Sequence, residues 1–366
     1  MHFATGGQMS PKIQVLYRDT GSYDAIARHG RLLVESLQAL GFDASYDGGG
    51  VRWLPPSGPG AGSWLLIQYN AYSYGRWGFA PKLIAYPWIA KRRRRGLRIA
   101  LFVHEWADDS GQEKLKRRVL LRWQRFQLGQ MVRRADVVLV STAEWSRKLG
   151  PFGSVPECWH IPIGSNIQPA KLSDGAARAA LGIPADSLVI GLFGGGHRSR
   201  AIGHVDRAID LIGSRVKDVV VLNLGHGAPS LAERPGVEIR TTGALSEYLL
   251  STHLSCCDIY LAPFLDGVST RRTTVAAALA HGLPVVGTST EATDDLFSDS
   301  PEAICLVDLD EVGQFAQQAL ALAVTPSRRA TLSVAGEELY RKHLSAGATA
   351  RRVAEALRLC ETDQTA

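Results

Sequence analysis

The sequence predicts two consecutive α/β domains, each built on a parallel sheet with helices on both faces. Its 366 residues exceed what one ordinary core covers and suit two domains of roughly 150 to 200 residues each. Short apolar segments alternate with longer segments of helical spacing in both halves, which is typical of parallel sheets. Proline and glycine gather at Pro162–Pro169, between the two series, and place the linker at about residues 163–175.

The first half opens with a strand and a helix. Ile13–Leu16 is a short apolar run, and apolar residues recur at helical spacing over Ala25–Leu40 until Gly41 ends the pattern. The other expected strands are Trp64–Gln68, Arg98–His104 and Val137–Ser141, and the expected helices between them are Lys82–Arg94 and Lys114–Arg134.

The second half repeats the pattern. The expected strands are Leu188–Phe193, Val219–Leu224, Val237–Thr241, Ile259–Ala262, Pro284–Gly287 and Ile304–Val307. The expected helices are Ile202–Gly213, Ser246–Cys256, Thr273–His281, Glu311–Ala323 and a final one at Ala348–Leu359. We therefore divide the chain into a first domain at 1–165, a second at 166–345, and a terminal helix within 346–366 that crosses back onto the first.

Composition narrows the class of protein. Hydrophobic residues make up 45% and charged residues 21%, as in globular proteins. Residues 1–12 lack a signal-peptide core, and no run of about 18 apolar residues follows, so we expect a cytoplasmic protein. The five cysteines form no CxxC or Cys/His ligand spacing, so we expect reduced core thiols and no metal site; they are Cys158, Cys256, Cys257, Cys305 and Cys360.

The net charge of +6 comes partly from two local runs, Lys91–Arg95 and Lys114–Arg118. Such runs attract phosphates, nucleic acid or anionic lipid. No RNA-binding or helix-turn-helix pattern accompanies them, so no nucleic-acid partner is expected and solvated helix ends are the simpler interpretation. Two acidic pairs, Asp108-Asp109 and Asp294-Asp295, are interpreted as solvated loop residues rather than as a metal motif.

In each half, a glycine-containing loop follows the first strand. Ligands of open parallel sheets lie beyond the carboxyl ends of the strands, where helix N-termini offer N–H groups. The first loop holds Thr20, Gly21, Ser22 and Tyr23, which would admit an acceptor or simply form a tight turn. The second combines Gly194, Gly195 and Gly196 with Arg198 and Arg200, a combination suited to a diphosphate. It lacks the GxGxxG spacing, which disfavours a dinucleotide fold.

The most informative segment is Pro263–Thr274. It places a carboxylate, two arginines and two threonines between a strand and a helix, where amides, hydroxyls and positive charge would meet one anion. Its predicted ligand-binding residues are Asp266, Gly267, Val268, Ser269, Arg271, Arg272, Thr273 and Thr274.

This segment resembles the nucleotide-sugar loop and helix of bacterial glycosyltransferases of family 4. The similar runs are Asp266–Arg272 and Ala278–Val286, and the order of Asp136–Thr142, Ile161–Asn166, Leu224–Gly227 and Thr242–Leu245 extends the resemblance over most of the chain. The resemblance implies the GT-B fold, two doubly wound Rossmann-like domains facing each other across a cleft. It also implies a nucleotide-diphosphate sugar donor and retention at the anomeric carbon. Arginines and helix amides can stabilise the departing diphosphate without a metal, so no metal or other cofactor is expected.

The family's residue roles carry over only in part. Counting back from Gly282, Ser269 and Ala277 hold the positions of two glutamates that are common in the family, and Asp266 would take over part of the first one's role. The resemblance puts Arg198 and Arg200 on the diphosphate and His104-Glu105, expected to be exposed at a strand end, at the sugar or acceptor. It puts the loop of Gly243, Ala244 and Leu245 beside the nucleobase and Asn166 in the cleft.

The sequence thus predicts transfer of a sugar to a hydroxyl or amine of a small molecule, glycan or lipid. The alternatives are a sugar-nucleotide epimerase or phosphorylase on the same fold, and an inactive binding or scaffold protein. Trp77–Arg95, with its aromatic groups followed by a basic cluster, also suggests a peripheral contact with anionic membrane. The simpler alternative is a helix packed on its own sheet with a charged end, and Pro81 and Pro87 limit its regularity.

Overall fold

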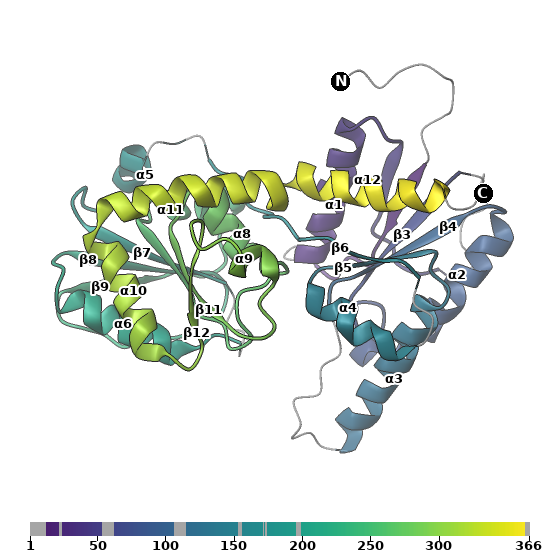
Figure 1. Cartoon of the computed structure of the whole chain (residues 1–366), viewed down its shortest axis with the longest axis horizontal. Helices are drawn as coiled ribbons and strands as arrows, with labels where there is room; N and C mark the ends of the chain where they lie inside the picture. The colour runs from purple at the N-terminus through teal and green to yellow at the C-terminus, as the bar shows by residue number, and fades with distance from the viewer. Residues whose placement is uncertain are drawn as a thin grey trace. The chain divides into compact units, whose positions relative to one another are not determined.

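The computed structural model describes residues 12–21, 24–52, 62–105, 115–152, 156–170, 172, 174–194 and 199–362. The chain divides into two units (Figure 1). Unit 1 comprises Met1–Pro162 and Ala346–Ala366, and unit 2 comprises Ile163–Ser345. The division falls after Pro162, within the Pro/Gly-rich segment, whereas the sequence places the boundary at residue 165.

Unit 1 is built on a six-stranded sheet in the order β2-β1-β3-β4-β5-β6. Every neighbouring pair of strands is parallel. The strands are β1 (Ile13–Leu16), β2 (Ala44–Asp47), β3 (Trp64–Tyr69), β4 (Arg98–Val103), β5 (Val137–Val140) and β6 (Cys158–His160). The helices are α1 (Ala25–Ala39), η1 (Arg76–Gly78), α2 (Pro81–Arg93), α3 (Leu115–Val132), α4 (Ala143–Leu149), η2 (Gly150–Phe152) and α12 (Ala346–Thr362).

The core of unit 1 lies between this sheet and its helices. All six residues of β3 are buried, as expected for a central strand covered on both faces. Asp24 caps α1, because its Oδ1 accepts hydrogen bonds from the backbone N–H groups of Ile26 and Ala27 at 3.0 Å. The terminal helix α12 lies alongside α1 (Figure 1). Its Thr349 hydroxyl donates to the Pro162 carbonyl at 3.1 Å, which ties α12 to the end of the first segment of unit 1.

Unit 2 is a second six-stranded parallel sheet, in the order β12-β11-β10-β7-β8-β9. The strands are β7 (Leu188–Phe193), β8 (Val219–Leu224), β9 (Val237–Thr241), β10 (Ile259–Ala262), β11 (Val285–Ser289) and β12 (Cys305–Asp308). The helices are α5 (Asp174–Ala180), α6 (Ile202–Gly213), α7 (Glu247–Leu254), α8 (Thr273–Ala280), α9 (Asp295–Ser298), α10 (Val312–Val324), α11 (Pro326–Leu339) and the π-helix η3 (Tyr340–Leu344). The predicted pair of doubly wound α/β domains is confirmed.

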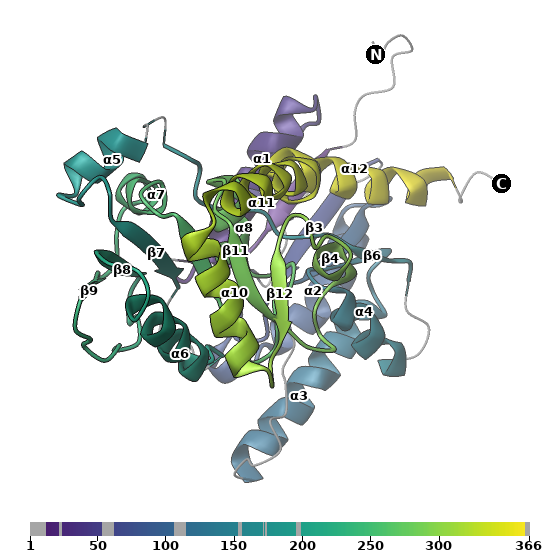
Figure 2. The ribbon, with the colours of Figure 1, turned by 60° about the vertical axis from the view of Figure 1, so that its left-hand side comes forward.

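Helices cover both faces of the unit 2 sheet. On one face α6 and α10 lie side by side (Figure 2) and bury Val205, Ile209 and Phe315 against the strands. On the other face, α7 and α8 bury Leu254 and Val275. This arrangement leaves the carboxyl ends of the strands and the loops that follow them as the place for a ligand.

None of the described helices has the length and apolar content that crossing a membrane requires. The four cysteines whose side chains are described carry free thiols. Cys256 and Cys257 are buried, and Cys158 and Cys305 are half-buried.

Candidate functional site

A cavity of about 190 Å³ opens in unit 2 at the carboxyl ends of β7 and β10. Its lining combines two aromatic rings with the arginines and hydroxyls predicted from the sequence. The lining residues are Phe193, Gly194, Ser199, Arg200, Phe264, Arg271, Arg272, Thr273 and Thr274. The first turn of α8 therefore forms part of the wall, where its N-terminus favours an anion.

Two loops distant in sequence are held together around this cavity. Arg200 and Phe264 form an antiparallel bridge. On either side of it, the Leu265 N–H donates to the Ser199 carbonyl at 2.7 Å and the Ala201 N–H donates to the Pro263 carbonyl at 2.9 Å. The loop after β7 is thereby fixed to the loop after β10, which explains why cations from both segments share one site.

Close backbone packing at Gly194 joins the loops of neighbouring strands. Gly194 has a φ of 139°, and a Cβ on Gly225 would lie 3.1 Å from the Gly194 carbonyl oxygen. The Gly225 N–H donates to the Thr242 hydroxyl at 3.2 Å. Gly243, Ala244 and Leu245 follow directly, but they do not line the cavity.

Asp266 binds the two arginines of its own loop. Its Oδ2 accepts from Nη2 of Arg271 and its Oδ1 from Nη2 of Arg272. The Arg272 guanidinium also lies 4.2 Å from the centre of the Phe264 ring, and its Nη1 donates to the Ser199 hydroxyl at 3.3 Å. Burial, and then the neighbouring Arg271 charge, lowers the pKa of Arg272 to about 10, so it stays charged at neutral pH. Both Asp266 oxygens are thus engaged in orienting arginines.

Arg200 adds a third cation, and it is only 9% exposed. Its Nη2 donates to the Phe193 carbonyl at 2.7 Å, whereas its buried Nη1 has no hydrogen-bond partner in the described part of the chain. A buried guanidinium with an unpaired N–H group is unfavourable unless a ligand accepts from it. Three arginines therefore line the cavity, and the loop that supplies two of them also holds one carboxylate, Asp266.

Asp294 supports the Ser269-Thr270 turn, a role that the sequence interpretation missed. We expected a solvated acid, but Asp294 is 2% exposed, and its Oδ2 accepts from the Thr270 N–H at 2.7 Å and from the Thr270 hydroxyl at 2.8 Å. No signal in the sequence pairs Asp294 with Thr270, because the two residues lie 24 positions apart in different loops. The other acidic pair, Asp108-Asp109, lies outside the described residues.

The remaining residues of this loop act through the backbone or in the core. Gly267 has a φ of 72°, and a Cβ there would lie 2.5 Å from the Thr293 hydroxyl oxygen. Val268 is fully buried, and its N–H donates to the Thr288 carbonyl at 2.9 Å. Ser269 is also buried, and its Oγ has no partner within the described ranges. None of the three lines the cavity.

Five predicted site residues lie outside the described residues: Ser22, Tyr23, Gly195, Gly196 and Arg198.

The predicted acceptor residue His104 is buried rather than exposed at the strand end. It follows β4 and is 6% exposed, its Nε2 is hydrogen-bonded to the Gln68 side chain, and its ring stacks on Phe102 at 4.4 Å. His29 from α1 approaches edge-on, with ring centres 5.2 Å apart. Burial, followed by repulsion from His29, holds the pKa of His104 well below its usual value, so the imidazole is neutral. The covering helix α1 explains the difference from expectation.

The other predicted acceptor residues are more accessible. Glu105 is half-buried, and its Oε2 accepts from the Asn70 side-chain amide at 2.7 Å. The Thr20 hydroxyl and N–H both donate to Asp24, at 2.5 and 3.1 Å, which ties the loop after β1 to the cap of α1. Gly21 follows with a φ of 153°. Asn166, expected beside them in the cleft, belongs to unit 2.

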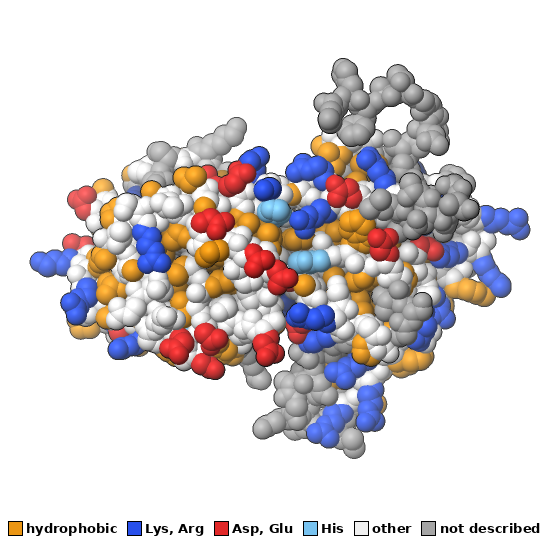
Figure 3. Space-filling model, in the orientation of Figure 1, with side chains coloured by type: hydrophobic (Ala, Val, Ile, Leu, Met, Phe, Trp, Pro, Cys, Tyr) orange, Lys and Arg blue, Asp and Glu red, His pale blue; other side chains and the backbone are white. Residues whose placement is uncertain are grey.

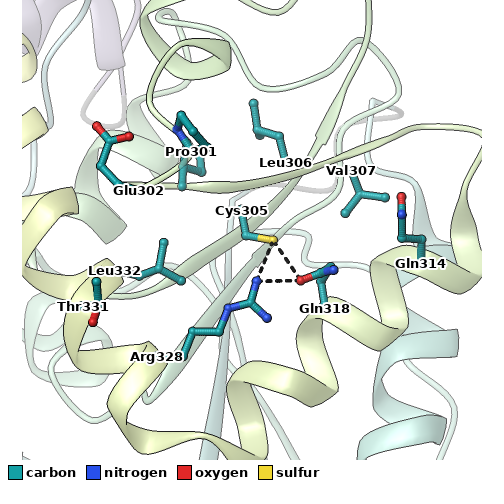
Figure 4. Close-up of a pocket in the computed structure, with 11 residues that line it drawn as sticks. Pro301, Glu302, Cys305, Leu306, Val307, Gln314, Gln318, Arg328, Thr331 and Leu332 are labelled. Atoms are coloured by element: carbon teal, nitrogen blue, oxygen red, sulfur yellow. Dashed lines mark hydrogen bonds between the residues drawn. The ribbon is translucent and has the colours of Figure 1, made fainter.

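A larger cavity of about 400 Å³ in unit 2 contains none of the predicted residues. Figure 4 shows Arg328 of α11 and Gln318 of α10 meeting Cys305 at the start of β12. The Arg328 Nη2 donates to the Gln318 Oε1 at 2.7 Å and lies 3.9 Å from the Cys305 Sγ. Pro301, Glu302 and Ile304, which precede the strand, line it too, so it lies away from the carboxyl ends where ligands of such sheets bind. The smaller, arginine-lined cavity is the better candidate.

The described residues contain no group of three or more His, Cys, Asp or Glu side chains placed to hold a metal ion.

Comparison with known proteins identifies the enzyme class. Residues 188–325 match the family model described as "Glycosyl transferases group 1". Among solved structures, sucrose-phosphate synthase from Thermosynechococcus elongatus is similar at a TM-score of 0.64 and 15% identity, with 97% of this chain and 100% of that one covered. The chain is a glycosyltransferase with the GT-B fold.

Two further solved structures share this fold. WaaG, a glycosyltransferase involved in lipopolysaccharide biosynthesis, has a TM-score of 0.63 at 12% identity, with coverage of 94% of this chain and 99% of that one. The Anabaena protein HepE, in complex with UDP and glucose, has a TM-score of 0.62 at 12% identity, with coverage of 95% and 100%. The matched family segment contains the whole arginine-lined cavity. A search of curated protein sequences finds no match.

Proposed function

We propose that this glycosyltransferase binds a nucleotide-diphosphate sugar in unit 2, with the diphosphate in the arginine-lined cavity. The observation that carries the proposal is the convergence of Arg200, Arg271 and Arg272 on one cavity at the carboxyl ends of the strands, where one carboxylate, Asp266, pairs with Arg271 and Arg272. The three cations exceed the single carboxylate by two charges, which matches the charge of about −2 on a nucleotide-sugar diphosphate. Thr273 and Thr274 at the start of α8 supply hydroxyls beside it.

This charge arrangement supports transfer without a metal ion. Breaking the bond between the sugar and the diphosphate builds negative charge on the departing phosphate, and fixed guanidinium groups stabilise that charge without reorganisation. Asp266 keeps two of those groups in place, so we assign it a positioning role in addition to its proposed place near the sugar. Retention at the anomeric carbon is the stereochemical outcome that the family 4 resemblance implies.

The solved relative in complex with UDP and glucose supports a UDP-linked hexose as the first donor to test. Gly243, Ala244 and Leu245, which follow β9, are the proposed nucleobase loop. The loop begins next to Gly225, because the Thr242 hydroxyl accepts from the Gly225 N–H, and Gly225 in turn packs against Gly194 of the cavity. Gly195, Gly196 and Arg198 belong to the same proposal for the diphosphate.

The acceptor is proposed to bind unit 1 at the loops after β1 and β4. Glu105 is half-buried with a carboxylate oxygen held by Asn70, and Thr20 and Gly21 are exposed residues of the loop after β1. Such groups suit hydroxyls or an amine of a small molecule, glycan or lipid. His104 is too buried to be a first contact, and it would position the neighbouring Glu105 or the end of the acceptor.

We also propose that unit 1 contacts anionic membrane through the segment from Trp77 to Arg95. Trp77, Phe79 and Trp88 are 66%, 53% and 51% exposed, which is unusual for large aromatic rings in a chain with a well-formed core. Interfacial aromatics next to a basic cluster suit a lipid headgroup layer. Sedimentation with anionic and with zwitterionic vesicles tests this contact.

Incubation with UDP-, GDP- and dTDP-sugars tests the catalytic proposal. We expect release of the nucleotide diphosphate from one donor, in excess EDTA as well as in its absence. Loss of activity in EDTA that Mg²⁺ or Mn²⁺ restores would contradict the metal-independent part. Epimerisation of the donor without nucleotide release would contradict sugar transfer, and the absence of both reaction and nucleotide binding would favour a scaffold protein.

A further inference from the structure

Unit 1 contains a cationic cavity of about 390 Å³ at the carboxyl ends of α2 and α3. Four of its eight lining residues are cations and one is a carboxylate. The lining residues are Pro87, Trp88, Lys91, Arg92, Arg133, Arg134, Ala135 and Asp136. It belongs neither to the donor cavity nor to the proposed acceptor loops.

The single carboxylate is already committed. Asp136 Oδ1 accepts from the Lys91 ammonium at 2.7 Å, and its Oδ2 accepts from the Ile99 backbone N–H at 2.6 Å. The Lys91–Asp136 pair therefore fixes the floor of the cavity and neutralises one cation. It leaves Asp136 unable to compensate the three arginines.

Those arginines have only neutral partners among the residues that the structure describes. Arg134 donates to the Gln130 carbonyl at 2.8 Å and to its side-chain oxygen at 2.7 Å, and Arg133 donates to the Phe152 carbonyl at 3.3 Å. The Arg92 guanidinium lies over the Trp88 ring, 3.9 Å from its centre. Three charges thus converge on one cavity with no carboxylate of their own, and each retains N–H donors for an anion.

We propose that this cavity binds the phosphate group of an anionic phospholipid. The inference rests on the proposed membrane contact and supplies its specific headgroup site. Trp88 is half exposed at the rim, where an indole suits the headgroup layer. The neighbouring surface of α3 carries an aromatic cluster in which the Trp123 ring lies 4.6 Å from Phe79 and 5.6 Å from Phe126.

The charge around this surface favours an anionic bilayer over a soluble anion. Lys and Arg side chains gather over α3 (Figure 3), and that helix contains Arg118, Arg122 and Arg125 without an acidic residue. A free phosphate would use only the cavity, whereas a lipid surface meets the cavity, the exposed rings and the basic helix together. We therefore expect vesicles to bind far better than inorganic phosphate.

The simpler explanation is that Arg133 and Arg134 only complement the dipole at the end of α3. A matched pair exists in the same unit, because Arg147 and Lys148 occupy the last turn of α4 and do not line the cavity. Replacing either pair by glutamine removes two charges from a helix end. The cavity explanation predicts that only one of the two replacements affects lipid binding.

The experiment measures partition of the full chain onto phosphatidylglycerol and phosphatidylcholine vesicles at low and moderate salt. Arg133→Gln/Arg134→Gln should lower partition onto phosphatidylglycerol by about 30-fold, because each cation at an anionic surface contributes about a factor of five. Arg147→Gln/Lys148→Gln should change it much less. Asp136→Asn, which frees Lys91, should raise partition onto phosphatidylglycerol by about fivefold. The melting temperature of each variant confirms that it is folded.

The outcomes separate the cavity from the membrane contact as a whole. Equal effects of the two glutamine pairs, with wild-type binding intact, would overturn the headgroup site and leave the membrane contact standing. No binding of the wild type to phosphatidylglycerol would overturn both. In a third outcome, millimolar inorganic phosphate abolishes the difference in vesicle binding between wild type and Arg133→Gln/Arg134→Gln, and the protein does not prefer vesicles to phosphate. That result would reassign the cavity to a soluble phosphate.

Discussion

Asp294 accepts two hydrogen bonds from Thr270, one from its backbone N–H at 2.7 Å and one from its hydroxyl at 2.8 Å. The two residues are buried and lie 24 positions apart, so this contact fixes the turn between the Asp266 arginine cluster and α8. A carboxylate in this place shapes the arginine-lined cavity without lining it.

Asp294→Ala should therefore destabilise unit 2 strongly. Both Thr270 donors would lose their charged acceptor in a buried place, at a cost of about 3 kcal/mol. The neighbouring exposed Asp295 is the matched control, and Asp295→Ala should change stability by only a few tenths of a kcal/mol. Urea unfolding measures both, and similar losses in the two variants would mean that the Thr270 contact contributes little.

Gly267→Ala should disturb the same loop for a different reason. Its φ of 72° is a left-handed conformation, and the new Cβ would lie 2.5 and 2.8 Å from the hydroxyl oxygens of Thr293 and Thr290. We expect a loss of about 1 to 3 kcal/mol. Gly203→Ala in α6, where no atom lies within 4 Å of the new Cβ, should instead stabilise by roughly 0.5 to 1 kcal/mol. A Gly267→Ala variant as stable as wild type would show that the loop moves aside easily.

The buried histidines should make unit 1 sensitive to acid. Burial lowers the pKa of His29 from 6.5 to about 4, so the unfolded chain takes up this proton first as the pH falls. The corresponding stability is present above about pH 6.5 and is lost towards pH 4, at about 1.4 kcal/mol per pH unit.

His29→Leu should reduce the dependence of the unfolding free energy on pH by the contribution of this one histidine. The His29 Nε2 has no hydrogen-bond partner within the described part of the chain, so an apolar replacement breaks no hydrogen bond of this atom. Urea unfolding between pH 7 and pH 4.5 compares the two slopes. Parallel curves for wild type and His29→Leu would mean that His29 is protonated in the folded protein as well.

His104→Ala should lower turnover much more than it lowers nucleotide affinity, because unit 1 is proposed to hold the acceptor. His104→Gln, which can keep a hydrogen bond to Gln68, should restore part of the turnover. Steady-state kinetics and a separate nucleotide titration distinguish the two effects. If turnover and affinity fall together and the melting temperature drops, His104 has only a packing role, as its 6% exposure and stacking on Phe102 would then suggest.

Much of the fold could be predicted because strands buried on both faces are uninterrupted apolar runs. The predicted bounds of the buried strands β7, β8 and β10 coincide with the observed ones. Those of β9 coincide as well, although it is an edge strand whose residues are half-buried or exposed. The two strands that the sequence did not indicate, β2 and β6, are the edges of the unit 1 sheet. Cys158–His160 has three residues, all half-buried, so it has neither the length nor the apolar content of an inner strand.

The site could be predicted only where charge and glycine occur together in one loop. Arg200, Arg271 and Arg272 could be grouped because parallel strands bring their loops to one edge. The burial of Asp294 could not, since its partner Thr270 belongs to another loop and the adjacent Asp295 is exposed. The covering of His104 depends on α1, which the pattern of β4 does not reveal.

The most direct test of the donor site is nucleotide-diphosphate binding by arginine variants of the cavity. Isothermal titration of wild type with UDP, GDP and dTDP selects the nucleotide, and Arg271→Gln and Arg272→Gln are then compared with the exposed Arg207→Gln of α6. A charge-assisted hydrogen bond contributes about 1.5 to 3 kcal/mol, so each cavity variant should bind roughly 10- to 100-fold more weakly, while Arg207→Gln binds like wild type. Unchanged affinity in both folded cavity variants would contradict the assignment of this cavity to the diphosphate.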